Sequence, residues 1–318
     1  MSNHRILVVM DREVIAAHDS SVAIIEEALL RDIAVDVCDT DDLCFVVEGA
    51  SAIVRRVRCA GIAGMALDRA RCERLAGYGA ILYRKDPPFT SRALEATLLL
   101  EHVRGSALLI NDPRGLRDAN EKLFALRFAG YSPPTAVLRD RAMIWEFCRA
   151  HDGRCVLKPL DGCGGRGVFA LRDGDPNAEV IIETATDEGR RRVIVQAWLP
   201  VCEHGDKRIF LLDGEPVGAL LRMPAGGDSR ANLRTGAEAR ATTLSAREQE
   251  IAHVVGRGCR ALGLAFVGLD VIAGHLTEVN VTSPTGLREL EQVGSGRLQT
   301  QILDWIGARL GVRACLVV

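Results

Sequence analysis

The sequence predicts an α/β protein that is divided into several domains. Its 318 residues suffice for two or three domains with a large buried core. The first third alternates short apolar strands with a helix, an order typical of a parallel sheet. The second half contains runs of β-branched residues around glycine turns, which predict antiparallel hairpins. The fold class is therefore α/β, within an α+β multidomain chain.

Composition and charge exclude several classes of function. The chain is 48% hydrophobic and 26% charged, as soluble globular proteins are, and its net charge of −2 favours no nucleic-acid partner. No apolar run reaches the roughly 18 residues that cross a bilayer, and residues 6–10 are too short for a signal-peptide core. The ten cysteines lack C-x-x-C spacing, which indicates reduced thiols rather than disulfides or a zinc site. We expect a cytoplasmic protein with no membrane partner.

The N-terminal elements place polar groups at one edge of the expected sheet. Strands are predicted at residues 5–10, 34–38 and 79–83, and a helix at residues 22–30. Ser20 and Ser21 precede this helix as its cap, and Arg84 follows the third strand. Ligands of parallel sheets collect beyond the carboxyl ends of the strands, where a helix N-terminus and an arginine suit a carboxylate. A capped surface helix beside a proline-stiffened turn is the alternative.

The middle of the chain predicts two helices and a glycine-rich flap. One helix should begin at residues 111–113 and end near Gly130, a Ser-Pro-Pro connector at 132–134 suits a domain boundary, and a second helix covers 142–150. Residues 162–167 fit G-x-G-x-x-G, but a strand follows where a dinucleotide site needs a helix. Two strands around this loop, with Lys158 on the first, indicate a flap that closes over phosphates. A flexible hairpin with a surface lysine is the alternative.

The next elements lead to a long polar loop. Strands are expected at residues 193–200 and 209–212, and a third strand ends at Arg222. Residues 223–237 then form a glycine-rich loop, and loops of this length are uncommon unless they are functional or disordered. We expect a mobile lid over residues 223–239. Helices at residues 248–262 and 298–310 complete the prediction.

Residues 266–282 predict a hairpin that could hold a metal. With a loop at residues 273–275, Asp270 lies opposite Glu278, and Asn280 is the diagonal neighbour on the same face, about 7 Å away. Facing carboxylates are unfavourable unless a cation separates them, and such hard oxygen ligands suit Mg²⁺. A solvated hairpin face is the alternative. A register slip of one residue would put the two carboxylates on opposite faces.

Several strings of residues resemble, in order and along nearly the whole chain, those of bacterial glutathione synthetase in the ATP-grasp superfamily. The strings are RKDPPF at 84–89, LRDANEKL at 116–123, LKPLDG at 157–162, GDKR at 205–208, DGEPV at 213–217, VGLD at 267–270 and TEVNVTSPT at 277–285. The resemblance implies an ATP-grasp fold with three parts. These are an N-terminal parallel-sheet, Rossmann-like domain at 1–120, a central lid subdomain with the phosphate flap at 121–198, and a C-terminal subdomain with the metal site at 199–318.

The same resemblance implies a reaction. ATP phosphorylates the carboxylate of γ-glutamylcysteine, and the amine of glycine attacks the acyl phosphate to give glutathione, ADP and phosphate. Phosphoryl transfer depends on metal ions, cationic groups and exclusion of water more than on a nucleophilic side chain, which agrees with the residues found. The resemblance also implies two Mg²⁺ ions, with Mn²⁺ as an alternative, and a homo-oligomer that is a dimer or a tetramer.

The matching strings imply a role for each site residue. The metal ligands are Asp270, Glu278 and Asn280. The ATP-binding residues are Lys122 and Lys158 at the phosphates, Gly164 and Gly165 in the flap, Gln196, Ala197 and Leu199 at the adenine, and Asp206 at the ribose. The groups that stabilise the transferring phosphoryl group and the acyl phosphate are Arg208 and Arg222. The substrate-binding residues are Ser20, Ser21 and Arg84 for the dipeptide, and Ser283, Pro284 and Thr285 beside the amine.

The chain departs from the family pattern near the substrates and the lid. The segment between Asp11 and Asp19 is short, Arg166 replaces a small residue in the flap, and residues 234–237 replace a lid sequence that ends in Gly-Gly. Gly286 stands where some members have Cys, and we expect it to leave room for a larger acceptor. Two other functions stay open: a ligase of the same mechanism that uses another amine or thiol peptide, and an inactive ATP-binding module that regulates a partner.

Overall fold

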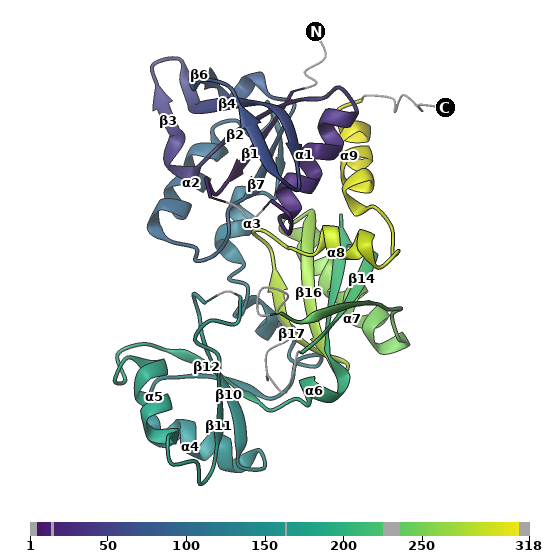
Figure 1. Ribbon diagram of the computed structural model, residues 1–318. Coiled ribbons are helices and arrows are strands. Elements are labelled where there is room, and N and C mark those ends of the chain that lie inside the picture. The colour runs from purple at the N-terminus through teal and green to yellow at the C-terminus, as the bar shows by residue number, and fades with distance from the viewer. Residues whose placement is uncertain (1–4, 14–15, 163, 225–235, 312–318) are drawn as a thin grey trace.

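The computed structural model describes residues 5–13, 16–162, 164–224 and 236–311. Their strands form three sheets: an eight-stranded sheet at the top of Figure 1, a five-stranded sheet in the middle and a four-stranded sheet at the bottom. None of the helices in this part of the chain is long and apolar enough to cross a membrane. The cysteines that the structure describes are free, as the sequence predicts.

The eight-stranded sheet is mixed rather than parallel throughout. Its strands are β1 Arg5–Met10, β2 Ala34–Cys38, β3 Leu43–Val46, β4 Gly49–Gly61, β5 Gly64–Leu67, β6 Arg71–Arg74, β7 Ala80–Arg84 and β8 Leu108–Ile110. As predicted, β1 is parallel to β2 and β7; β8 is also parallel to β7. The long β4 is antiparallel to β2 and also pairs with β3, β5 and β6. No helix separates the strands between residues 43 and 74, so they pair by short antiparallel turns.

The first helix, α1 (Ser20–Leu30), has a different cap from the one predicted. Asp19 Oδ1 accepts hydrogen bonds from the backbone N–H groups of Ser21 (2.7 Å) and Val22 (2.9 Å). Aspartate in an extended conformation caps a helix as well as serine does. Ser20 and Ser21 are therefore first-turn residues, and both are buried.

The helix predicted from residue 111 to Gly130 is interrupted. The structure has α3 (Pro113–Asp118), then a turn, then a short 3₁₀ helix, η3 (Phe124–Phe128). Asn120 Oδ1 accepts from the backbone N–H groups of Lys122 (3.1 Å) and Leu123 (3.0 Å). Such a side-chain bond to the following backbone competes with helical hydrogen bonds, and it ends the helix before Lys122.

The four-stranded sheet forms a separate lobe with its own core (Figure 1). Its antiparallel strands are β11 Phe169–Arg172, β10 Arg154–Pro159, β12 Val193–Ala197 and β9 Thr135–Leu138, in that spatial order. The helices α4 (Arg141–Ala150) and α5 (Ala178–Thr186) pack on this sheet through buried side chains such as Ile144, Ile182 and Leu157. The hairpin of β10 and β11 carries the glycine-rich flap, as predicted.

The five-stranded sheet lies between the other two lobes. Its antiparallel strands are β15 Glu238–Ala241, β14 Glu215–Met223, β13 Asp206–Leu212, β16 Phe266–Ile272 and β17 His275–Asn280, in that order. The remaining helices are α2 Ser91–Glu101, α6 Val201–His204, α7 Ala246–Ala261, α8 Leu287–Gln292 and α9 Leu298–Arg309. The last helix returns to the N-terminal lobe, where α9 lies beside α1 (Figure 1) and Asp304 pairs with Arg31 at 2.6 Å.

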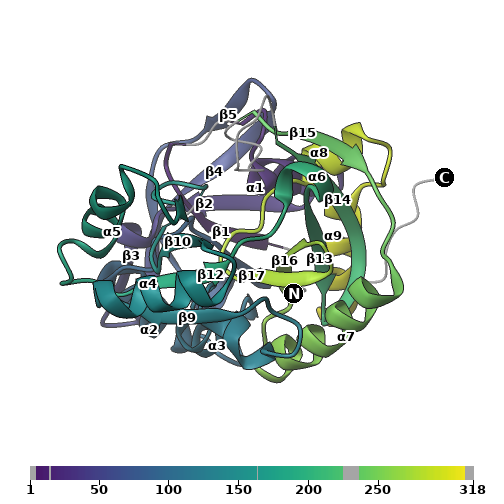
Figure 2. The same ribbon diagram turned by 90° about the horizontal axis from the view of Figure 1, so that it is seen from below.

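Two predictions about organisation are not decided by these elements. Most of the lid predicted at residues 223–239 lies outside the described residues, which stop at residue 224 and resume at residue 236. The division into domains at 1–120, 121–198 and 199–318 also stays a prediction. Figure 2 shows the molecule from below, with the four-stranded sheet in front of the other two.

Candidate active site

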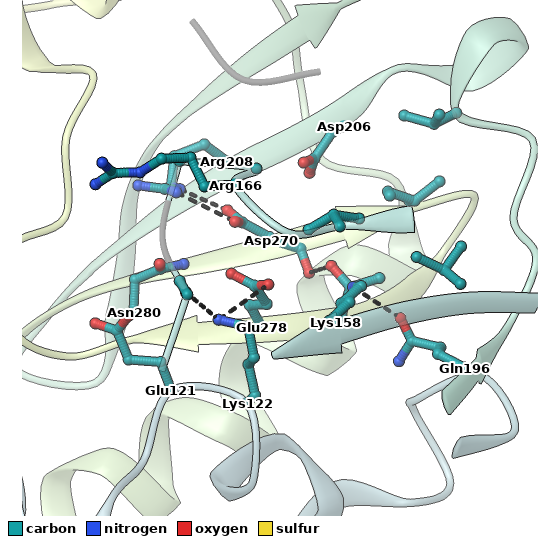
Figure 3. Close-up of a pocket in the computed structure, with 18 of the residues that line it drawn as sticks. Glu121, Lys122, Lys158, Arg166, Gln196, Asp206, Arg208, Asp270, Glu278 and Asn280 are labelled. Carbon is teal, nitrogen blue, oxygen red and sulfur yellow. Dashed lines mark hydrogen bonds and ion pairs between the residues drawn. The ribbon is translucent and has the colours of Figure 1, made fainter. Parts of the chain in front are cut away.

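The pocket that collects most of the predicted residues is lined by segments from all three lobes (Figure 3). It encloses about 1340 Å³, counting the part open to solvent. Its walls are the segment after β7, the flap between β10 and β11, the end of β12, and β13, β14, β16 and β17. The predicted residues that line it are Lys122, Lys158, Gly164, Gly165, Gln196, Ala197, Leu199, Asp206, Arg208, Arg222, Asp270, Glu278, Asn280, Ser283 and Thr285.

The predicted metal ligands lie together on the hairpin of β16 and β17. Asp270 is opposite Glu278, and Asn280 is opposite Gly268, two pairs further along the ladder and so on the same face of the sheet. All three predicted ligands line the same pocket, as Figure 3 shows. The pairing of the two carboxylates on one face is therefore confirmed.

The turn of this hairpin differs from the prediction. It has two residues rather than three, because Ile272 pairs with His275. Ala273 and Gly274 both have positive φ (48° and 73°), as two-residue hairpin turns of type I′ require. A β-bulge at Thr277 then adds the residue that the shorter turn leaves out. The two differences cancel, so Asp270 still lies opposite Glu278, as predicted.

Two arginines neutralise Asp270 within the folded protein. Arg208 Nε donates to Asp270 Oδ1 at 2.6 Å, and Arg222 lies 2.9 Å from the same oxygen. Arg222 is also 2.7 Å from Asp206. Burial would raise the pKa of Asp270, but the two guanidinium groups outweigh it and hold that pKa well below its usual range. Burial raises the pKa of Asp206 to about 6 although Arg222 opposes the shift, and the charge of Asp270 adds to it.

Gly268 makes room for Arg208, and the sequence analysis gave it no role. A Cβ on Gly268 would lie 3.0 Å from Arg208 Cδ and 3.0 Å from Pro284 Cβ. Both contacts are tighter than side chains normally allow. The absence of a side chain lets Arg208 lie across β16 and reach Asp270 and the carbonyl of Thr285, at 3.1 Å. The VGLD string contained this signal, since a glycine inside a strand often marks a close approach.

The two predicted phosphate lysines reach the pocket from different lobes. Lys122 Nζ donates to the carbonyl of Gly162 at 2.5 Å and is 3.8 Å from Glu278 (Figure 3). Lys158 Nζ donates to Gln196 Oε1 at 3.0 Å. Lys122 therefore connects the flap loop to the carboxylate hairpin. Both ammonium groups face the pocket in which phosphates are expected.

The predicted dipeptide residues Ser20, Ser21 and Arg84 are not among the residues that line this pocket. Ser20 Oγ accepts from the backbone N–H groups of Gly286 (3.1 Å) and Leu287 (3.2 Å), so it caps α8. Ser21 Oγ accepts from Arg84 Nε at 3.1 Å. The Ser20 hydroxyl therefore joins the N-terminal lobe to the start of α8, whereas the Ser21 hydroxyl orients Arg84 within the N-terminal lobe.

Arg84 is a buried cation with incomplete pairing. It is 4% exposed, and one of its nitrogens donates to the carbonyl of Pro284 at 2.9 Å. Its Nη1 has no hydrogen-bond partner, and among the described residues no carboxylate lies within ion-pair distance of it. Burial lowers the pKa of Arg84 to about 10. These features suit an anionic ligand, and the predicted dipeptide role of Arg84 stays a prediction.

Gly286 does not enlarge the pocket, contrary to expectation. Its φ is +115°, a conformation that residues with a side chain rarely adopt. A Cβ there would point at Phe210 Cζ (3.2 Å) and Leu220 Cδ2 (3.4 Å), which belong to the core. The glycine is required by the backbone at the start of α8 and says nothing about the size of the acceptor.

The comparisons with known proteins agree with this geometry. The family model of the prokaryotic glutathione synthetase N-terminal domain matches residues 5–117, and the model of the same family's ATP-grasp domain matches residues 121–295. The chain belongs to the prokaryotic glutathione synthetase family. The ATP-grasp fold and the α/β class predicted from the sequence are thereby confirmed.

Individual relatives of the family cover most of the chain. A glutathione synthetase of Synechocystis sp. is 40% identical over 301 residues, which are 91% of this chain and 94% of that protein. The glutathione synthetase of Pseudomonas aeruginosa is 48% identical over 235 residues, 73% of this chain and 74% of that protein. Among solved structures, D-cycloserine synthetase has the same fold, with a TM-score of 0.68 at 19% identity over 96% of this chain and 99% of that one.

Glu121 is a further pocket residue that the sequence analysis missed. Its carboxylate accepts from the backbone N–H groups of Val281 (3.2 Å) and Thr282 (3.3 Å) and from the Thr282 hydroxyl (2.9 Å), and burial raises its pKa. Its carbonyl accepts from the backbone N–H of Val279 at 2.9 Å. Glu121 thus holds the backbone on both sides of Asn280. The signal was its place next to Lys122 in the NEKL string.

Proposed function

We propose that this family member is a glutathione synthase, which joins γ-glutamylcysteine and glycine at the expense of ATP through an acyl phosphate. The observation that carries the proposal is that the predicted carboxylates, lysines and arginines line one pocket. No Ser–His or Cys–His pair is needed, because phosphoryl transfer depends on positioning and charge stabilisation.

We propose a different role for each group of residues along the pocket. Lys122, Lys158 and the backbone of the flap bind the ATP phosphates, while Gln196 and the end of β12 hold the adenine. Arg208 and Arg222 stabilise the negative charge of the γ-phosphoryl group while it is transferred from ATP to the carboxylate of the dipeptide. Asp206 is proposed to approach the ribose, although it is paired with Arg222 here.

The donor set suits a divalent cation. Asp270, Glu278 and Asn280 supply hard oxygen atoms from one sheet face, and phosphate oxygens of ATP would complete the coordination. The described residues contain no group of three His, Cys, Asp or Glu that could hold a metal, and the proposed site has two carboxylates and an amide. When bound, the metal neutralises phosphate charge; we propose two Mg²⁺ ions, with Mn²⁺ as the alternative.

The residues that bind the dipeptide and the incoming amine are proposed from their charge and position. Arg84, supported by Ser21 and near Ser20, is proposed to bind a carboxylate of the dipeptide through its unpaired Nη1. The segment from Ser283 to Thr285 is proposed to border the incoming amine. We also propose the three-domain division given above, a cytoplasmic location and a homo-oligomer, all of which rest on the family resemblance.

The experiment is a coupled ADP assay with ATP, Mg²⁺ and γ-glutamylcysteine across a panel of amines, with mass spectrometry of the product. We expect glutathione to form fastest from glycine. A clear preference for another amine would favour the alternative ligase. ATP binding without ADP release in any mixture would leave only the regulatory module.

A further inference from the structure

Asp86 is a carboxylate of the pocket to which neither the family strings nor the roles above assign a function. It follows β7 and lines the pocket with Ser283 and Thr285. The Ser283 hydroxyl donates a hydrogen bond to its carboxylate. The Asp86 backbone N–H donates to Asp11 Oδ2 at 3.0 Å, and Lys85 pairs with the same Asp11. The backbone of this loop is thus fixed at the sheet edge while the carboxylate borders the pocket.

The charges near Asp86 act on its pKa in opposite directions. They include Arg84, two residues earlier in the chain, and two acids, Asp11 after β1 and Asp19 before α1. Burial raises the pKa of Asp86; the Ser283 bond and Arg84 oppose that shift, and the two acids add to it. A carboxylate with a raised pKa is a better proton acceptor near neutral pH.

We propose that Asp86 binds the ammonium group of the acceptor amine and takes one of its protons as the amide bond forms. The inference rests on the proposed function, since only a ligase with an amine acceptor needs such a group. The ammonium gives one proton to Asp86, and the nitrogen lone pair attacks the acyl carbon. The bond from that carbon to the phosphate oxygen breaks, its electron pair leaves with phosphate, and the second nitrogen proton is taken up by the departing phosphate.

Geometry favours the acceptor amine over the α-ammonium of the γ-glutamyl group. Ser283, which bonds to Asp86, and Thr285, which holds Arg208 through its carbonyl, belong to one short segment after β17. Asp86 therefore shares a wall with the arginine that faces the reacting phosphoryl group. Arg84, the group suited to the dipeptide carboxylate, lies outside the residues that line the pocket.

The test separates formation of the acyl phosphate from its use. Positional isotope exchange in ¹⁸O-labelled ATP with γ-glutamylcysteine, without glycine, reports the first step. We expect Asp86→Asn to keep this exchange within about 3-fold of wild type and to lose at least roughly 100-fold in kcat/KM for glycine, the lower range for a general base. Hydroxylamine is uncharged at neutral pH and needs no base, so the variant should retain hydroxamate formation.

The dependence of kcat/KM for glycine on pH is a second, independent test. In wild type, kcat/KM for glycine should fall on acidification as Asp86 becomes protonated, and this limb should vanish in Asp86→Asn. Ser283→Ala removes a bond that lowers the pKa of Asp86, so its acid limb should move to higher pH. Ser283→Ala also serves if Asp86→Asn fails to fold. The matched control is Asp187→Asn, an exposed aspartate on the far lobe whose left-handed φ of 50° asparagine tolerates.

Three results would overturn the inference. One is an unchanged glycine reaction in Asp86→Asn, and another is loss of hydroxamate formation together with the glycine reaction. The third is loss of isotope exchange with a raised KM for γ-glutamylcysteine, which would assign Asp86 to the donor's ammonium group. A wild-type protein that makes no product from the dipeptide and glycine would instead refute the proposed function itself.

Discussion

The buried arginines of the site differ in how their charge is balanced. At the phosphate end, Arg208 and Arg222 share Asp270, and Arg222 also pairs with Asp206. At the proposed dipeptide end, Arg84 has a hydroxyl and a carbonyl as partners, and its Nη1 has no hydrogen-bond partner in the part of the chain that the structure describes. Charge balance in the folded chain therefore distinguishes two kinds of cationic group. An anionic ligand could neutralise Arg84, whereas Arg208 and Arg222 are already paired with Asp270, which is a proposed metal ligand.

Breaking the phosphate end should have the largest effect. Arg222→Met leaves Asp206 and Asp270 without a shared cation, and removal of one partner from a buried ion pair costs about 3–5 kcal/mol. We expect a loss of this size in the free energy of unfolding, measured by urea denaturation, together with loss of ADP formation. A variant as stable as wild type would show that these carboxylates are not held by Arg222.

Removal of a proposed metal ligand should lower activity without lowering stability. Glu278 is 22% exposed at its side chain, and its nearest described cation, Lys122, is 3.8 Å away. We therefore expect Glu278→Ala to keep the melting temperature within a few degrees and to lower kcat by roughly 1000-fold or more, the equivalent of several kcal/mol of charge stabilisation. The exposed Glu250→Ala on α7 is the control and should keep its kcat. Comparable activity of both variants would argue against a metal role for Glu278.

Arg84 should behave in the opposite way from Arg222. Replacing a buried cation that has no carboxylate partner with methionine removes a desolvation cost, so Arg84→Met should be as stable as wild type or more stable. It should raise the KM for γ-glutamylcysteine by about 10- to 100-fold, because a hydrogen bond to a charged group contributes roughly 1.5–3 kcal/mol. Steady-state kinetics and thermal melts decide the point. An Arg84→Met variant that is strongly destabilised but has an unchanged KM for γ-glutamylcysteine would contradict this account of Arg84.

The smallest expected effect concerns the placement of Arg208. Gly268→Ala puts a methyl group 3.0 Å from Arg208 Cδ and should displace the guanidinium from Asp270. Since a misplacement of about 1 Å can cost up to 100-fold, we expect kcat to fall on the order of 10-fold with little change in KM for ATP. Gly130→Ala, whose added methyl group has no neighbour within 4 Å, is the control. Equal kcat values for the two variants would show that Arg208 tolerates the shift.

Local patterns predicted much of the site and less of the long-range pairing. The face shared by Asp270 and Glu278 follows from strand alternation, and it was correct even though the turn and the bulge were not foreseen. The role of Ser20 could not be predicted in the same way, because its partners at the start of α8 are 266 and 267 residues away. The antiparallel arm around β4 was missed for a similar reason, since alternation of strands and helices carries no information about sheet order.

The position of Gly286 shows how a sequence departure can mislead. A glycine where relatives have a larger residue suggested extra space for the acceptor, but its backbone conformation and its core neighbours explain it fully. Sequence comparison records that a side chain is absent, and only coordinates show in which direction it would have pointed.

The central claim is that the C-terminal carboxylate of γ-glutamylcysteine becomes an acyl phosphate in the pocket that Arg208 and Arg222 line. The most direct measurement supplies the dipeptide with ¹⁸O in its C-terminal carboxylate, together with ATP, Mg²⁺ and glycine, and analyses the inorganic phosphate by mass spectrometry. We predict that one ¹⁸O atom appears in phosphate for each glutathione formed. Glutathione formed with unlabelled phosphate would contradict the proposed mechanism.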